Sequence, residues 1–153
     1  MATVAFDAKS TQLVGLDSAP PKNLDEGPIM GGKVRIKVAE YTATALVAGK
    51  RIELARLPKG CRILPESCVI TEDFAASTTM AIGYNQTVGA LSSDTQFAAQ
   101  TAVTTAGTKI PFVSTMLGEK LAEDTSIHIL TAGATLTANK KLKLFLYYVP
   151  VID

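Results

Sequence analysis

Few side chains in this chain of 153 residues could catalyse a reaction. Its single histidine, His128, stands between Ile127 and Ile129 in an apolar, strand-like run. A nucleophilic triad would need that imidazole as its base. A lone histidine in a strand more often lies on the outward face, so we expect His128 to be a surface residue rather than a catalytic one.

Two pairs of adjacent carboxylates, Glu72-Asp73 and Glu123-Asp124, are the other candidates for acid–base chemistry. A glycosidase needs two carboxyl groups that flank one bond. Neighbouring residues of a strand point to opposite faces, so adjacent carboxylates could cooperate only in a loop. Both pairs fall at predicted turns, where acidic residues are common, and we expect them to be turn residues.

The two cysteines, Cys61 and Cys68, do not have the spacing of a metal site. A disulfide across the bend at Pro65-Glu66 is sterically conceivable. Two reduced thiols are favoured, because cysteine packs as a small apolar side chain. The sequence also lacks a phosphate-binding glycine loop, a histidine-rich metal helix and a calcium loop. We therefore expect no catalytic residues, no metal and no cofactor.

Composition and charge exclude further classes of function. Charged residues make up 19% of the chain and its net charge is +1, whereas soluble domains average ~25% charged residues. So small a net charge would not draw the chain to nucleic acid or to an anionic membrane. The first residues do not resemble a signal peptide, and no apolar run is long enough to span a membrane. We expect synthesis in a cytoplasm, and a surface partly covered by a partner.

Alternating residues predict that strands carry these side chains. In 33–41, Val34, Ile36 and Val38 share one face and basic residues share the other. We expect the apolar face to be buried and the basic face to be solvated, although contact with phosphate or an acidic partner stays open. In the last strand, Leu142, Leu144, Leu146 and Tyr148 share a face. The opposite face begins with lysines, predicted to be wet, and ends with Phe145 and Tyr147, predicted to be covered.

The whole pattern predicts an all-β domain over residues 33–153. Seven or eight short strands alternate with turn signals, and no long helix is indicated, as in an antiparallel jelly-roll-like sandwich or barrel. Residues 74–108 carry a single charge, Asp94. A capping-box pattern at 93–96 predicts one or two helical turns there, inside a long loop. That loop could be a binding surface or filler between strands.

Residues 1–32 are predicted to be an extended N-terminal arm. Proline and glycine interrupt this region too often for a helix or a central strand. Four apolar residues, Phe6, Leu13, Val14 and Leu16, are the candidate interaction residues, since a solvated linker has little use for them. The arm would become ordered on a neighbouring subunit. A partly disordered tail is the alternative.

Four segments together resemble small structural proteins of tailed-bacteriophage virions: Arg51–Leu64, Phe74–Tyr84, Asp94–Ala99 and Thr131–Leu144. The resemblance covers residues 33–149 and rests on the order of patterns rather than on one motif. Within that group the chain is most similar to capsid cement or decoration proteins. The resemblance implies a jelly-roll-like domain without an active site, a place on the capsid surface, the major capsid protein as partner, and a homotrimer.

Two other functions stay open at this stage. The chain could be a head-fibre, tail or adhesin module that binds a host glycan through residues 85–108. The absence of tryptophan and the four tyrosines are against it, since glycan sites use aromatic platforms. A lysin or depolymerase would need a catalytic cluster, and the sequence does not indicate one.

Overall fold

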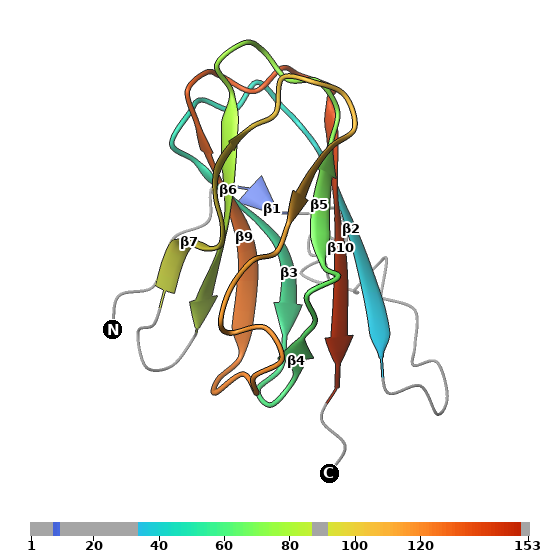
Figure 1. The fold of residues 1–153 in the computed structure, drawn as a ribbon. Coiled ribbons are helices and arrows are strands. Elements are labelled where there is room, and N and C mark those ends of the chain that lie inside the picture. Colours follow the sequence, from blue (N-terminus) through green and yellow to red (C-terminus); the bar gives the residue numbers. More distant parts are fainter. Residues whose placement is uncertain (1–7, 10–33, 87–91, 151–153) are drawn as a thin grey trace, which may run out of the picture.

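The computed structural model describes residues 8–9, 34–86 and 92–150 and has an all-β architecture (Figure 1). Its strands are β1 (Ala8–Lys9), β2 (Arg35–Thr42), β3 (Arg51–Leu57), β4 (Arg62–Ile63), β5 (Cys68–Thr71), β6 (Thr79–Gln86), β7 (Ser92–Ala102), β8 (Thr108–Pro111), β9 (Thr125–Ala132) and β10 (Lys141–Val149). Sheet A has the order β1-β3-β9-β6-β7. Sheet B has the order β2-β10-β5-β8, with β4 also paired to β10. The pairing of β1 with β3 is parallel, and the other pairings between these strands are antiparallel.

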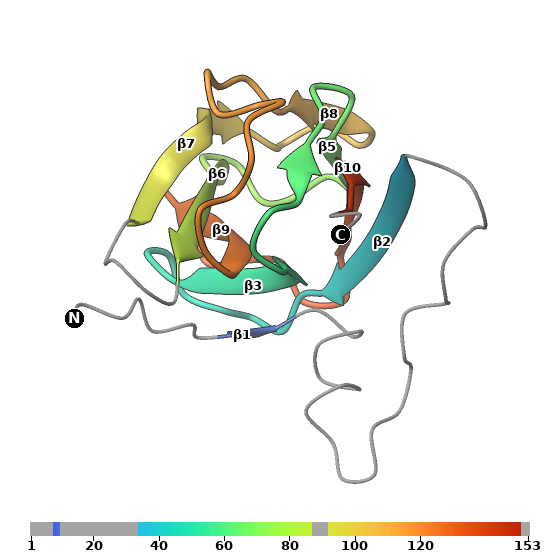
Figure 2. The same cartoon turned by 90° about the horizontal axis from the view of Figure 1, so that it is seen from below.

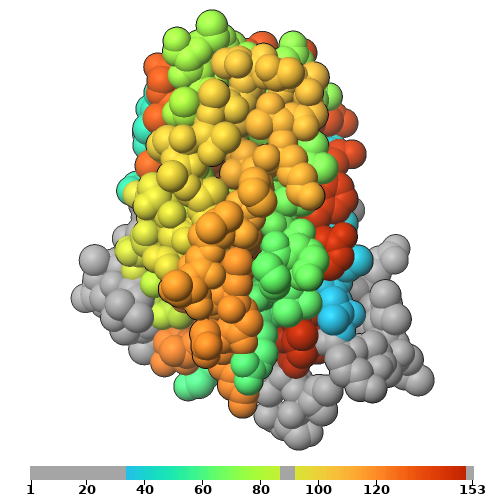
Figure 3. Space-filling model, viewed as in Figure 1, coloured from blue at the N-terminus to red at the C-terminus, as the bar shows by residue number. Residues whose placement is uncertain are grey.

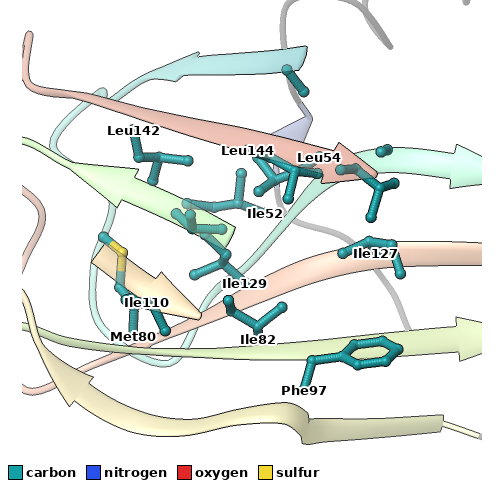
Figure 4. Packing of buried hydrophobic residues seen from close by; sticks show 14 of the residues in the cluster. Ile52, Leu54, Met80, Ile82, Phe97, Ile110, Ile127, Ile129, Leu142 and Leu144 are labelled. Carbon is teal, nitrogen blue, oxygen red and sulfur yellow. The ribbon is translucent and has the colours of Figure 1, made fainter. Parts of the chain in front are cut away.

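The two sheets face each other as layers of a sandwich, which confirms the predicted jelly-roll-like fold (Figure 2). The core between them comes from both layers (Figure 4). Sheet A contributes Ile52, Ile82 and Ile129, and sheet B contributes Leu142 and Leu144, all fully buried. Each aliphatic side chain of this kind stabilises the fold by roughly 1.5–3 kcal/mol. The strands are therefore fixed by the side chains between the layers.

The segment between β8 and β9 closes one open side of the sandwich. Figure 3 shows it, in orange, running between β7 and the green residues that precede and include β5. Backbone hydrogen bonds hold the segment at both sides: Val113 N donates to Phe97 O at 2.7 Å, and Gly118 N donates to Ile63 O at 2.7 Å. Phe112 stacks on Phe97, with ring centroids 5.0 Å apart. This segment thus links sheet A to sheet B.

The predicted orientation of the first part of β2 is wrong. Val34, Ile36 and Val38 are 46%, 53% and 44% exposed. The residues that face the core are instead Ala39 and Tyr41, which are buried. The register with β10 explains the reversal. Ala39 lies opposite Leu144 and Tyr41 lies opposite Leu142, and strict alternation then turns the three aliphatic residues outward.

The predicted helical turns at 93–96 are also wrong, because these residues belong to β7. The strand pairs with β6, for example Ala98 with Ile82 and Ser93 with Tyr84. A single helical turn fixes several residues for one hydrogen bond and is rarely stable alone. The unpaired edge of β6 offers a ladder instead, so long-range pairing overrides the local capping signal.

Of the predicted arm, the structure describes Ala8 and Lys9, which pair with Ile52 and Glu53 of β3. Phe6, Leu13, Val14 and Leu16 lie outside the described residues. The arm and its boundary with the domain at residue 32 therefore stay predictions.

Candidate functional site

A charged cluster on sheet A contains the one histidine. Arg51 on β3 donates from Nε and Nη2 to the two carboxylate oxygens of Asp94 on β7, at 2.8 and 2.7 Å. Nε2 of His128 on β9 lies 2.7 Å from Oδ1 of the same carboxylate. Asp94 thus joins three strands that are far apart in the sequence.

Strand register brings these residues together. His128 lies opposite Glu53 of β3 on one side and opposite Gly83 of β6 on the other. A Cβ atom on Gly83 would come within 2.1 Å of the Ser93 carbonyl oxygen and 2.6 Å of the Asp94 Cα atom. The missing side chain of Gly83 therefore lets β7 cross directly over β6. That crossing places the Asp94 carboxylate next to the imidazole.

The environment fixes the charge of both groups. The hydrogen bonds from Arg51 lower the pKa of Asp94 to about 2, and His128 acts in the same direction, against the effect of burial. Burial lowers the pKa of His128, although Asp94 opposes this shift. At neutral pH the carboxylate is therefore ionised and the imidazole neutral, and Nε2–H donates to Asp94.

A β-bulge between Glu53 and Ala55 extends the cluster along β3. Residues three apart on a regular strand face opposite sides, but a bulge adds one residue and restores the same side. Arg56 accordingly donates from Nε and Nη2 to the two carboxylate oxygens of Glu53, at 2.8 and 2.9 Å. Glu53 is fully buried, and this two-point bond compensates its desolvation.

The cluster is suited to holding strands together rather than to catalysis. His128 has no exposed surface, so the prediction that it lies on the surface is wrong. An imidazole buried in this way and bonded to Asp94 cannot reach a substrate. Nothing in the sequence pointed to Asp94 as its partner, since the two residues are 34 positions apart and lie on strands that do not pair directly.

The carboxylate pairs make turn contacts, as expected. Glu72 accepts a hydrogen bond from the Lys141 backbone at 2.8 Å, and Asp73 binds the Lys140 ammonium at 2.8 Å. Asp124 accepts a hydrogen bond from the Lys59 backbone at 2.8 Å. These contacts tie loops to neighbouring turns.

Both cysteines are buried and neither forms a disulfide, as the sequence favoured. Burial raises the pKa of the Cys68 thiol, which keeps it protonated and unreactive at neutral pH. Among the described residues, no cluster of histidine, cysteine or acidic side chains is placed to hold a metal ion. The described part of the chain also has no helix long and apolar enough to cross a membrane.

The outer face of sheet B is the most unusual surface of the described domain. Its apolar end consists of Val34, Ile36, Val38, Phe145 and Tyr147, and its basic end of Glu40, Ile70, Lys109, Lys141 and Lys143. At the apolar end, Ile36 lies opposite Tyr147 and Val38 opposite Phe145. Both aromatic residues are partly exposed. Contiguous apolar side chains on an exposed sheet commonly mark a contact surface.

The basic end is organised around one carboxylate. Glu40 binds the ammonium groups of Lys141 at 3.1 Å and Lys143 at 3.3 Å. The hydrogen bond from Lys141 lowers the pKa of Glu40, and Lys143 adds to the effect. The lysine end is therefore wet, as expected. The aromatic end, expected to be covered, is partly exposed within the described chain.

The fold of this chain occurs in the capsids of three phages. A chain in the structure described as the capsid of Ralstonia phage GP4 aligns over 97% of this chain and 100% of its own length, with a TM-score of 0.70 and 21% identity. A chain of the cyanophage Pam1 capsid asymmetric unit aligns over 88% and 97%, with a TM-score of 0.59 and 19% identity. A chain of the acid-stable capsid of Helicobacter pylori bacteriophage KHP30 aligns over 80% and 92%, with a TM-score of 0.50 and 14% identity. No family model and no curated protein sequence matches the chain.

Most of the segment predicted to be a long glycan-binding loop is a β-strand. Of residues 85–108, 92–102 form β7 and pair with β6. The hypothesis of a glycan-binding adhesin therefore loses the irregular loop on which it rested. Residues 87–91 lie outside the described part of the chain.

Proposed function

We propose that this chain is a non-enzymatic structural protein of a tailed-phage virion, and that it binds and stabilises the capsid shell as a cement or decoration protein. The observation that carries the proposal is the end-to-end likeness to a chain of the Ralstonia phage GP4 capsid, over 97% of one chain and 100% of the other. A capsid chain that consists of this one domain suits an accessory role on a shell. The proposal is also supported by the residues considered for catalysis: His128 is buried and bonded to Asp94, and Glu72 is bound to the Lys141 backbone at a turn.

The mechanism of stabilisation is the burial of surface against several subunits at once. Apolar area removed from water contributes about 25 cal/mol per Å². Separate weak contacts of one protein with neighbouring shell subunits become strong together, because the second contact forms at a high effective concentration. We propose the major capsid protein as the partner and a homotrimer as the form that spans adjacent subunits.

The test uses the full-length protein and shells of the phage that encodes it, prepared without this protein. We expect the protein to sediment with the shells and to raise the temperature at which they disassemble. Light scattering on the free protein should give three times the mass of one chain. Shells that neither bind the protein nor gain stability would contradict the cement function, and a monomeric mass would contradict the trimer alone.

The proposed arm contact is tested with point substitutions. Deleting residues 1–32 would remove β1, which pairs with β3, so a deletion would confound binding with folding. Leu13→Asp and Val14→Asp in the full chain change the proposed contact residues and leave β1 intact. We expect weaker binding to shells at an unchanged unfolding temperature, and unchanged binding would remove the role of the arm.

A further inference from the structure

The outer face of sheet B has the properties of an interface that lacks its partner. Four of the six most exposed large hydrophobic side chains of the described residues lie on this face: Val34, Ile36, Val38 and Ile70. The first three follow one another at every second position, so they form a continuous row. Phe145 and Tyr147 of β10 extend this row across the sheet by their register with β2. Exposing such a row to water costs free energy that a partner surface would recover.

Charge indicates what kind of surface fits here. At the basic end, Lys141 and Lys143 both bind Glu40, and Lys109 lies across the sheet on β8, opposite Ile70 of β5. These three lysines and one carboxylate carry a net charge of +2. Lys141 and Lys143 are 48% and 50% exposed. Ion pairs this exposed are weak, so the lysines can turn toward carboxylates on a partner. The complementary surface is therefore apolar over one half and acidic over the other.

A second copy of this chain fits less well. Two copies that met through the same face, with like ends in contact, would bring lysines against lysines at the basic end. Like charges placed together weaken a contact and select against the wrong partner. The charge pattern thus favours a partner of different sequence.

We propose that the outer face of sheet B is the surface that docks onto the capsid shell, against an apolar patch of the shell protein bordered by carboxylates. The inference rests on the proposed function and deepens it by assigning the contact surface. Apolar contacts between β2, β10 and the shell provide affinity. The lysines of the basic end set the orientation and the rate of association.

The experiment compares two double variants of the full-length protein in binding to shells that lack it. Ile36→Lys/Val38→Lys places two charges on the apolar end. Val47→Lys/Val113→Lys adds the same charge at side chains that are 53% and 70% exposed elsewhere on the surface. We expect the first variant to bind shells about tenfold more weakly or worse, and the control to bind like the wild type. Because all four positions are exposed, both variants should keep the unfolding temperature of the wild type.

Charge reversal tests the second half of the proposal. Lys141→Glu/Lys143→Glu should weaken binding to shells more at low than at high ionic strength, because salt screens the lost attraction. Lys59→Glu/Lys120→Glu makes the same change of charge at exposed positions away from sheet B's outer face and should have little effect. Unchanged binding by Lys141→Glu/Lys143→Glu would overturn the acidic border.

The outcomes separate this inference from the function beneath it. If the wild-type protein does not bind shells, the cement function itself is refuted, and this inference with it. Wild-type protein that binds, together with an Ile36→Lys/Val38→Lys variant that binds equally well, would overturn only the docking face. If that variant instead changes the solution mass of the free protein and leaves shell binding intact, the face joins copies of this chain and the inference is wrong.

Discussion

Asp94 lies at the centre of the charged cluster on sheet A, because its one carboxylate accepts hydrogen bonds from two strands other than its own. Arg51 binds both of its oxygens, and His128 shares one of them. A buried imidazole needs a partner for its N–H group, since an unsatisfied donor would be costly. The carboxylate therefore stabilises the folded chain through both neighbours.

We expect Asp94→Asn to destabilise the domain by about 1–3 kcal/mol, because hydrogen bonds to charged groups contribute about this much. The amide cannot accept both bonds from Arg51, and its own NH₂ group faces the guanidinium. The free energy of unfolding in urea measures the loss. Asp73→Asn is the matched control: it removes the exposed contact with Lys140 and should leave the unfolding midpoint unchanged. Equal effects of the two substitutions would contradict the role of Asp94.

The role of His128 could not be predicted from the sequence. Alternation along 125–132 is ambiguous, because Ile127, His128 and Ile129 are all buried. The sheet is covered on both faces at this point, and β7 covers the outer face. The capping-box pattern at 93–96 predicted helical turns there, so the strand β7 was not expected. A single sequence shows composition and local period, but not which distant strand crosses over a given residue.

Among the elements, the close approach of β7 to β6 depends on one residue, Gly83. Gly83→Ala would place a Cβ atom 2.1 Å from the Ser93 carbonyl oxygen, and backbone cannot turn aside as a long side chain can. We expect a loss of about 3 kcal/mol, at the upper end of overpacking effects, in the free energy of unfolding. Gly49→Ala meets no atom within 4 Å but has φ +83°, so it should cost only about 1–2 kcal/mol. A Gly83→Ala variant as stable as the wild type would show that β7 does not need this close approach.

The strands themselves were largely predictable, and their orientation was less so. In β10, Leu142, Leu144 and Leu146 are buried as expected. They are three successive aliphatic residues on one face of the strand, whereas the opposite face begins with two lysines. In β2 the apolar residues change faces after Val38, so that the row with the longer alternation lies outside. The buried pair, Ala39 and Tyr41, is shorter in sequence but is fixed by its register with β10.

For the whole molecule, the lowered pKa values of His128 and Asp94 predict that acid destabilises the fold. The pKa of His128 is lowered in the folded state, so the unfolded chain binds more protons once the pH falls below 6.5, and stability begins to decrease there. The pKa of Asp94 is lowered from 3.8 to about 2. Its contribution is present above 3.8 and is lost as the pH falls toward 2.

The free energy of unfolding, measured from neutral pH down to acid, should therefore fall in two stages. His128→Gln removes the titrating imidazole while keeping an N–H donor for Asp94, and should flatten the first stage only. A wild-type protein whose stability is constant as the pH falls through 6.5 would contradict the assignment of His128 as a buried neutral group.

The pairing of β2 with β10 also has a consequence for how the protein is made. Residues 35–42 can complete sheet B only with residues 141–148, so that sheet cannot form on the ribosome until the last strand has been synthesised. Contacts between such distant parts of a chain make folding slow. During that interval β2 has apolar side chains on both faces, Ile36 and Val38 on one and Tyr41 on the other, and an unpaired edge. Nascent chains that crowd together would associate through this strand before they fold, so the yield of folded protein depends on how quickly translation proceeds from β2 to β10.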